Sequence, residues 1–321
     1  MGATSINGID NAHKDFSDGV ALHPFSVRTP GGVSVSGWTH FPQYKASYAP
    51  LLIAIHGGWT SSAYFNIDEE HSLVPMSKQL GIPVIAIDRP GYCRSSPAPA
   101  AEFTIKEQGR HLARHVLPFL WSEYGQQLGC SSLVIVGHSI GAAITISTAA
   151  YANQQDFPLA GIIISGCSSH TFVDWKARGI TAEGGPIPFP NPEGFQDTAN
   201  PIDKEYYIPA LRRLPSLSHP IPPAELLEIS GPWEREIGPQ LASRVQVPVH
   251  HAMGEHDGLW QVDPDSMATF RSWFPASISF SNRIVPMVGH DIEASKQARA
   301  WVLYIYSRAL EISVGYAVER E

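Results

Sequence analysis

The sequence has few cysteines, no long apolar run and no leader-like start. Only three cysteines, Cys93, Cys130 and Cys167, occur among 321 residues, and none forms a Cys-x-x-Cys pair. A disulfide framework is therefore not expected, which fits a reducing compartment. No run approaches the roughly 18 consecutive apolar residues of a membrane span. The first residues lack the basic and apolar regions of a signal peptide, so we expect a cytoplasmic protein without a membrane span.

A block of basic residues is also missing. The chain carries 22 Lys and Arg against 30 Asp and Glu, a formal charge of −8. Nucleic acid is therefore not an expected partner, because binding to phosphates needs clustered basic side chains. The content of 43% hydrophobic and 16% charged residues is that of a globular protein.

Short apolar runs alternate along the chain with segments of helical character. The runs are 51–55, 84–87, 133–136, 159–164 and 247–252, and the helical segments are 105–128, 142–151 and 292–310. Runs that are apolar on both faces are typical of parallel strands covered by helices, so the pattern predicts an α/β fold with a doubly wound, mostly parallel sheet. Two alternating stretches, 23–29 and 33–40, flank Pro30-Gly31-Gly32 and predict an antiparallel hairpin at one edge.

Residues 167–243 break this alternation. They contain no strand-like run and carry twelve prolines. Loops of such length are rare in compact domains unless they serve as lids or binding elements. We therefore predict an inserted, mainly helical cap, with short helices near 204–214 and 224–227. The cap divides one catalytic core into residues 1–166 and 244–321.

The strongest chemical signal is Gly137-His138-Ser139-Ile140-Gly141, which lies between a predicted strand and a predicted helix. A serine on such a sharp turn has an exposed hydroxyl and strained backbone, and the flanking glycines avoid collisions with the strand and helix. The N-terminus of the following helix favours a developing anion at the same place. The motif predicts that Ser139 is a nucleophile.

A serine hydroxyl needs a base to remove its proton, so the sequence must also supply a histidine. His290 is the best candidate among fourteen histidines, because it follows the strand-like stretch 278–285 and precedes the final helix. A carboxylate should orient this histidine from the end of the preceding strand. Asp257 is our choice there, and Glu255 is the alternative. Asp263 and Asp265, further along, are expected to cap a helix that starts near residue 264.

Acyl transfer also needs N–H donors for an oxyanion. One is the Ile140 amide, directly after the serine. The second is expected from His56-Gly57-Gly58-Trp59, after the strand 51–55, where paired glycines let backbone amides approach a ligand closely. Either Gly58 or Trp59 would supply it.

Together these motifs resemble those of the α/β-hydrolase superfamily, in its capped, single-domain branch. The resemblance covers roughly residues 51–310 and rests on five motifs in the family's order: His56-Gly57-Gly58, Asp88-Arg89-Pro90-Gly91-Tyr92, Gly137 to Gly141, Gly254 to Asp257 and Gly289-His290. Cys93 departs from the pattern, because a glycine is usual at that place. The resemblance implies a serine hydrolase rather than a dehalogenase or epoxide hydrolase, since those relatives use an aspartate where this chain has Ser139.

We expect the substrate to be an ester or thioester of a medium-sized, largely apolar small molecule. The predicted cap is rich in aromatic side chains, namely Phe172, Trp175, Phe189, Phe195, Tyr206, Tyr207 and Trp233. Pockets are mostly apolar, so we expect Phe172, Trp175 and Trp233, together with His138, to contact the substrate.

Several alternatives stay open at this point. The same triad would serve an acyltransferase or a carbon–carbon bond hydrolase, because the pocket chooses the acceptor. A ligand-binding receptor with a retained triad and little turnover is a further possibility. No cofactor is expected. His250, His251 and His256 do not suggest a metal site, since adjacent histidines on a strand face opposite sides. The oligomeric state stays open, a homodimer included.

Overall fold

The computed structural model describes residues 22–29, 32–96, 103–188, 197–203, 206–207 and 218–320. The Pro30-Gly31 part of the predicted hairpin turn, Phe189 and Phe195 lie outside these ranges. Most of the helix predicted near 204–214 lies outside them too.

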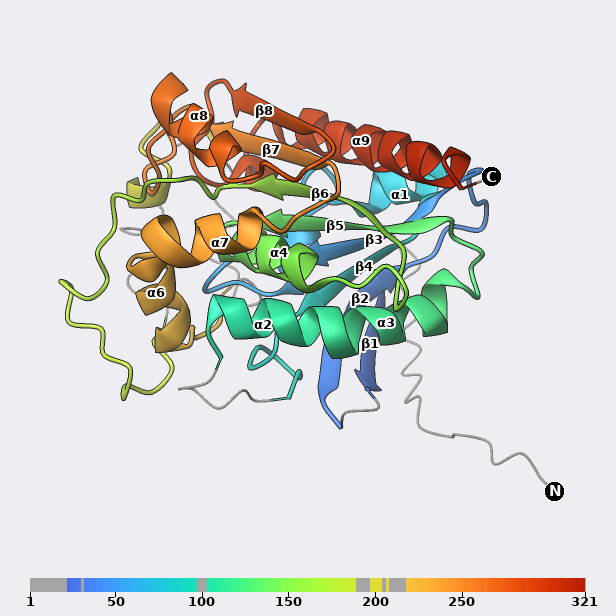
Figure 1. Cartoon of the computed structure of the whole chain (residues 1–321), viewed down its shortest axis with the longest axis horizontal. Coiled ribbons are helices and arrows are strands. Elements are labelled where there is room, and N and C mark those ends of the chain that lie inside the picture. Colours follow the sequence, from blue (N-terminus) through green and yellow to red (C-terminus); the bar gives the residue numbers. More distant parts are fainter. Residues whose placement is uncertain are drawn as a thin grey trace.

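Eight strands form one sheet in the order β1-β2-β4-β3-β5-β6-β7-β8 (Figure 1). They are β1 (His23–Arg28), β2 (Ser34–His40), β3 (Pro50–Ile55), β4 (Val84–Asp88), β5 (Ser132–His138), β6 (Leu159–Ser165), β7 (Val249–Gly254) and β8 (Phe280–Val285). β1 and β2 form the predicted antiparallel hairpin, and β2 is also antiparallel to β4. The other neighbours are parallel, so the predicted fold class is confirmed.

Helices cover both faces of the sheet (Figure 1). One layer contains α2 (Ile105–His111), α3 (Leu117–Leu120), α4 (Ile140–Tyr151) and α7 (Gly238–Ala242), and the other contains α1 (Val74–Leu80) and α9 (Ala298–Val318). Two further helices in the described residues are α6 (Pro223–Ile229) and α8 (Pro264–Ser272). The predicted helix 105–128 is interrupted by π-helical turns at Leu112–Val116 and Trp121–Gly125, on either side of Pro118, which has no backbone N–H to donate.

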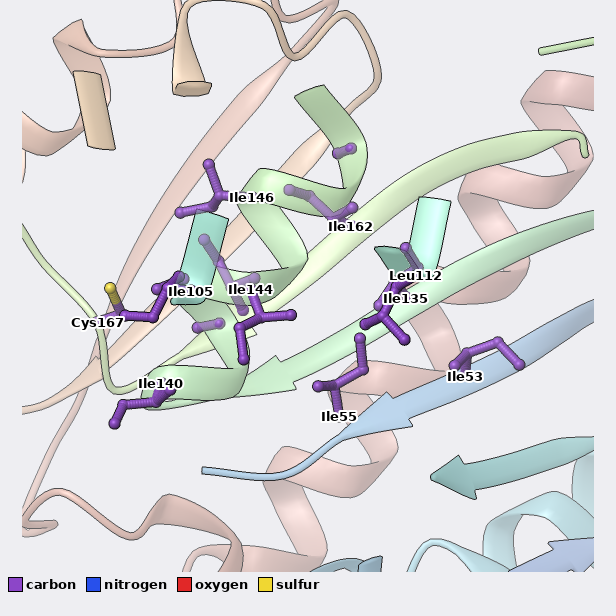
Figure 2. Packing of buried hydrophobic residues seen from close by; sticks show 14 of the residues in the cluster. Ile53, Ile55, Ile105, Leu112, Ile135, Ile140, Ile144, Ile146, Ile162 and Cys167 are labelled. Carbon is purple, nitrogen blue, oxygen red and sulfur yellow. The ribbon is translucent and has the colours of Figure 1, made fainter. Parts of the chain in front are cut away.

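The central strands are buried on both faces, as their uniform apolar sequences predict. Ile53 and Ile55 of β3 pack in the cluster that contains Ile135 of β5 and Ile144 of α4 (Figure 2). Alternate residues such as Leu52 face the opposite cluster, which includes residues of α9. This alternation follows from the two-residue period of a strand. It fixes β5, and hence the turn that follows it, between two packed layers.

The last helix begins later than predicted. Residues 292–294 form a short 3-10 turn, and α9 starts at Ala298. Ser295 between them has extended backbone, and its hydroxyl accepts a hydrogen bond from the Gln297 amide at the start of α9. The predicted start of α8 is confirmed, because Asp263 caps the helix by accepting from the Ser266 amide, while Asp265 lies in its first turn.

Cys93 lies in the turn after β4, at the place where the resemblance leads us to expect a glycine. The Gly91 amide donates to the Ser96 carbonyl across the turn. Cys93 itself has a φ of +50°, in the left-handed region that favours glycine. All three cysteines are free thiols.

The chain between β6 and β7 includes α6, a π-helical turn (Trp233–Ile237) and α7, and its described residues contribute no strand to the sheet. In the described ranges, no helix is long and apolar enough to cross a membrane.

Candidate active site

Ser139 lies on the sharp turn between β5 and α4. Its φ of 56° and ψ of −125° are unusual for a residue with a side chain, and such strain costs about 1–3 kcal/mol. The flanking glycines are required by space. A Cβ on Gly137 would lie 2.3 Å from the Thr145 hydroxyl oxygen, and one on Gly141 would lie 2.2 Å from the Ile55 carbonyl oxygen.

A chain of two hydrogen bonds links Ser139 to a buried carboxylate through His290. The Ser139 Oγ lies 2.9 Å from Nε2 of His290, and Nδ1 of the same ring lies 2.8 Å from Oδ2 of Asp257. The other oxygen of Asp257 accepts hydrogen bonds from the backbone amides of Leu259 and Trp260. These bonds hold the carboxylate toward the imidazole, so His290 presents its second nitrogen to the serine.

Glu255 does not reach His290. Its side chain is about half exposed, and its Oε2 accepts a hydrogen bond from the Met287 amide. The structure therefore brings together Ser139, His290 and Asp257, and it leaves the alternative carboxylate outside the group.

The electrostatic surroundings favour the charged form of His290. Burial lowers the pKa of its imidazole, but Asp257, Asp291 and Glu293 together outweigh burial and raise that pKa to about 9. The three carboxylates are all buried in the protein. A protonated His290 is therefore well stabilised beside Ser139.

Two of the three predicted oxyanion donors are the backbone amides of Gly58 and Ile140. Within the described residues, the Gly58 and Ile140 amides donate no hydrogen bond to the protein. The two residues are close neighbours, because a Cβ on Gly58 would lie 3.0 Å from the Ile140 side chain. Trp59, the other predicted donor, has a φ of 55° and accepts a hydrogen bond from the His219 amide through its carbonyl.

The comparison with family models concerns the chain as a whole. Residues 52–303 match the model described as the alpha/beta hydrolase family. The chain belongs to this family. By sequence, no curated protein matches it.

Solved structures of similar fold are distant in sequence. The carboxylesterase CesB from Bacillus subtilis shares 18% identity, with a TM-score of 0.59 over 92% of this chain and 93% of that chain. An esterase from Thermogutta terrifontis shares 16%, with a TM-score of 0.58 over 91% and 99%. The N-acyl homoserine lactonase AidH, in a mutant complex with N-hexanoyl homoserine, shares 15%, with a TM-score of 0.59 over 91% and 98%. At this identity the likeness establishes a shared α/β-hydrolase fold.

A mostly apolar pocket opens on Ser139 in this α/β-hydrolase. Its empty volume is about 650 Å³, including the open mouth. The apolar side chains that line it come from the loop after β3, the start of α4, the segment between β6 and β7, and the loop after β7: Trp59, Ile140, Val173, Trp175, Leu226, Ile229, Leu259 and Trp260. Such a wall suits an uncharged, hydrophobic ligand.

Of the four residues that were predicted to contact the substrate, two line the pocket and two do not. Trp175 and His138 line the pocket. Phe172 does not, because its side chain is 60% exposed on the surface. Trp233 does not either, since it is fully buried in the hydrophobic core. Leu226, Ile229 and Trp260 line the pocket but were not singled out by sequence, because aliphatic and aromatic residues in a helix or loop give no sign of which way they point.

The chain between β6 and β7 packs against the loop after β3. The Trp59 and Trp175 rings meet edge to face, with centroids 5.2 Å apart. The Trp59 indole N–H also donates to the Ile187 carbonyl. Deeper in the protein, the Arg89 guanidinium contacts Glu225 of α6 at 2.7 Å and donates to the Gly57 carbonyl. Glu225, between β6 and β7, is therefore linked through Arg89 to the backbone next to Gly58.

The histidines on β7 lie apart from each other. His250 contacts the Ser281 hydroxyl, whereas His251 is buried and contacts the Cys167 carbonyl and Asn282. In the parts of the chain that the structure describes, no group of three or more His, Cys, Asp or Glu side chains is arranged to hold a metal ion.

Proposed function

We propose that the protein is a serine hydrolase that cleaves an ester or thioester of a medium-sized, largely apolar small molecule. One observation carries the proposal, namely the hydrogen-bonded chain from Ser139 through His290 to Asp257 at the base of an apolar pocket. The likeness of fold to two esterases agrees with this chemistry.

In the proposed reaction, the Ser139 Oγ attacks the carbonyl carbon while its proton moves to Nε2 of His290. Asp257 keeps the Nδ1 proton in place and stabilises the imidazolium that forms. The Gly58 and Ile140 amides donate to the oxyanion of the tetrahedral intermediate. His290 then gives the proton to the leaving alcohol or thiol, which leaves an acyl group on Ser139. A water molecule, deprotonated by His290, releases the acid by the reverse steps.

The proposed cap, residues 167–243, gives this reaction its selectivity. Trp175, Leu226 and Ile229 of this segment line the pocket together with Trp59 and Trp260. The wall offers apolar surface to the acyl or alcohol part of a substrate, and the described residues that line it include no Lys or Arg to pair with an acid. We therefore propose uncharged acyl chains longer than acetyl as the preferred group.

The test is hydrolysis of a panel of esters, thioesters and lactones with mass detection of products, by the wild type and by Ser139→Ala. Loss of the nucleophile of an unrelated serine hydrolase costs on the order of a millionfold in turnover, so the variant should be near background. Ser272→Ala is the matched control, because Ser272 is exposed and bonds only to the carbonyl of its own helix. A folded Ser139→Ala protein that keeps more than about a tenth of the wild-type rate would contradict the proposal.

Two further measurements separate hydrolysis from the alternatives that share this triad. Added alcohols or amines reveal acyl transfer, because the acyl product then appears on the acceptor instead of as a free acid. A fluorophosphonate labels a reactive serine whether or not the protein turns over. Labelling at Ser139 without multiple turnover of any ester would indicate a receptor and overturn the proposed activity.

A further inference from the structure

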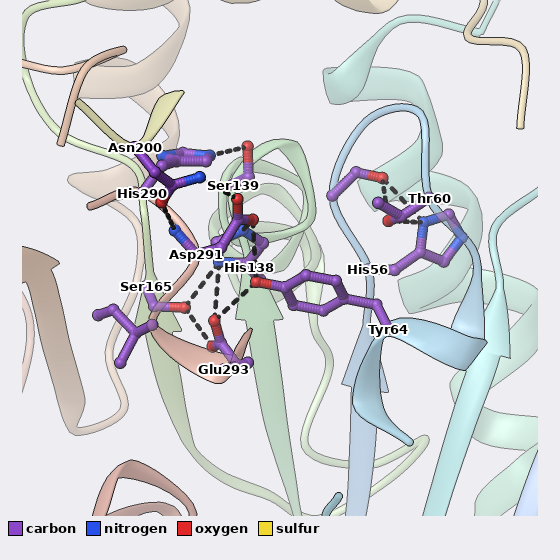
Figure 3. Close-up of polar contacts among 12 residues, drawn as sticks. His56, Thr60, Tyr64, His138, Ser139, Ser165, Asn200, His290, Asp291 and Glu293 are labelled. Carbon is purple, nitrogen blue, oxygen red and sulfur yellow. Dashed lines mark hydrogen bonds and ion pairs between the residues drawn. The ribbon is translucent and has the colours of Figure 1, made fainter. Parts of the chain in front are cut away.

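A second group of polar side chains is buried directly behind His290. It contains His138, Asp291 and Glu293, and all three are less than 10% exposed (Figure 3). His138 precedes Ser139 on β5, and Asp291 follows His290 in its loop. The pairs Ser139–His290 and His138–Asp291 therefore lie side by side, and both link the end of β5 to the loop that carries His290.

Each carboxylate in this group is held by several donors. Asp291 accepts from Nδ2 of Asn200 at 2.8 Å and from the Tyr64 hydroxyl at 3.2 Å. Glu293 accepts from the Ser165 hydroxyl at 2.7 Å and from the indole N–H of Trp301 at 2.8 Å. The Tyr64 hydroxyl also lies 3.0 Å from Glu293. These are the contacts that ionised carboxylates need when they are buried, because each ionised oxygen only accepts hydrogen bonds.

His138 lies between the two carboxylates and faces acceptors with both ring nitrogens. Its Nε2 is 3.4 Å from Asp291, and its Nδ1 is 3.3 Å from Glu293 and 3.1 Å from the Ser165 hydroxyl. Ser165 gives its own proton to Glu293, so it accepts from His138. The ring of His138 thus lies between two buried carboxylates, so the group contains more acidic side chains than basic ones.

This group lies next to His290. The His138 and His290 rings are 4.9 Å apart between centroids, and Asp291 is the next residue in the chain. Tyr64 closes the other side, since its ring stacks on His138 with centroids 4.7 Å apart. The proposed mechanism uses none of these groups, because only Asp257 contacts the Nδ1 atom of His290.

From this arrangement we infer that Asp291 and Glu293, held by His138, are positioning residues: together with Asp257 they stabilise the charged imidazolium of His290, and they join its loop to the Ser139 turn. The inference rests on the proposed function, since it assigns these residues to the same base. Buried charges act strongly here because water does not screen them.

The charged groups around His290 favour its protonated form, as the inference requires. Asp257 approaches from the loop after β7, Asp291 and Glu293 from its own loop, and His138 from β5. Burial lowers the pKa of His290, whereas Asp257 and then Asp291 and Glu293 raise it. Burial would also raise the pKa of Asp291, but His138 and His290 hold that pKa at about 2, so Asp291 stays ionised.

The experiment compares Asp291→Asn and Glu293→Gln with wild type in the pH profile of kcat/KM. Each substitution removes one negative charge and keeps the shape. The acid limb, which reports protonation of His290, should move to lower pH by on the order of one unit. The plateau rate should fall severalfold, because a weaker base removes the serine proton less readily. Asp265→Asn removes an exposed carboxylate from α8, so the acid limb of its pH profile should lie at the wild-type pH.

A structural role is tested separately with Tyr64→Phe. This variant removes the hydroxyl that contacts both carboxylates but removes no charge, so stability should fall while the acid limb of the pH profile stays near its wild-type position. The Nδ1 proton resonance of His290, followed by NMR against pH, measures the same protonation without substrate. If it titrates at the wild-type pH in both carboxylate variants, the inference is wrong. A shift of this resonance in a protein that hydrolyses no ester would uphold the inference and reject the proposed activity.

Discussion

The carboxylate of Asp257 lies 2.8 Å from the Nδ1 atom of His290, and two backbone amides hold it there. Glu255, only two residues earlier, bonds instead to the Met287 amide at the surface. The two acids therefore have unequal access to the same histidine.

This inequality predicts different kinetic effects of two amide substitutions. Asp257→Asn should lower turnover by roughly ten-thousandfold, because His290 would adopt the wrong tautomer. Glu255→Gln should change turnover little. The measurement is kcat for a p-nitrophenyl acyl ester with both folded variants. Equal and mild effects would contradict our assignment of Asp257.

The activity should depend on pH in a defined direction. The proposed base works only when His290 is neutral, and its pKa is raised to about 9. The value of kcat/KM should therefore rise with pH and reach half its plateau near pH 9. A profile already flat from pH 6 upward would show that His290 is not the base in the free enzyme.

Two aromatic residues of the proposed cap provide a matched pair for selectivity. Trp175 lines the pocket, whereas Phe172 is exposed outside it. In wild type each added methylene should gain up to about 0.8 kcal/mol, roughly fourfold in kcat/KM, until the pocket is full. Trp175→Ala should flatten or shift this series of two to twelve acyl carbons, and Phe172→Ala should leave it unchanged. If the wild type prefers acetyl esters and Trp175→Ala has the wild-type profile, the segment is not the selector.

Glu228 of α6 gives a prediction for stability. Its Oε2 accepts from the Lys106 amide at the start of α2, and burial raises its pKa from 4.5 to about 7. A raised carboxyl pKa means that its contribution to stability is complete below pH 4.5 and is lost as the pH rises through about 7. Glu228→Gln does not ionise, so its free energy of unfolding relative to wild type should increase between pH 5 and pH 8, by on the order of 2 kcal/mol. Denaturant unfolding at both pH values measures this change. Glu255→Gln, an exposed control, should show none.

Much of the fold was predictable because its signals are local. Continuous apolar runs such as 133–136 predicted strands with two buried faces, and the strand-to-helix context of Ser139 predicted its turn. A short run of glycines and a serine determines backbone conformation over a few residues, so neighbouring residues suffice to find it. The late start of α9 was missed, because buried contacts of the preceding loop, such as those of Glu293, come from other parts of the chain.

The sequence by itself determined the strands of the sheet, the main helices between them, and the candidate residues Ser139, His290 and Asp257, whose catalytic roles stay a prediction. Only the tertiary structure decided where side chains point. It turned Glu255 outward, placed Trp175 in the pocket, buried Trp233 and set His138 beside Asp291, 153 residues away in the chain. The physical reason is that backbone turns follow from adjacent residues, whereas side-chain contacts follow from how distant elements pack together.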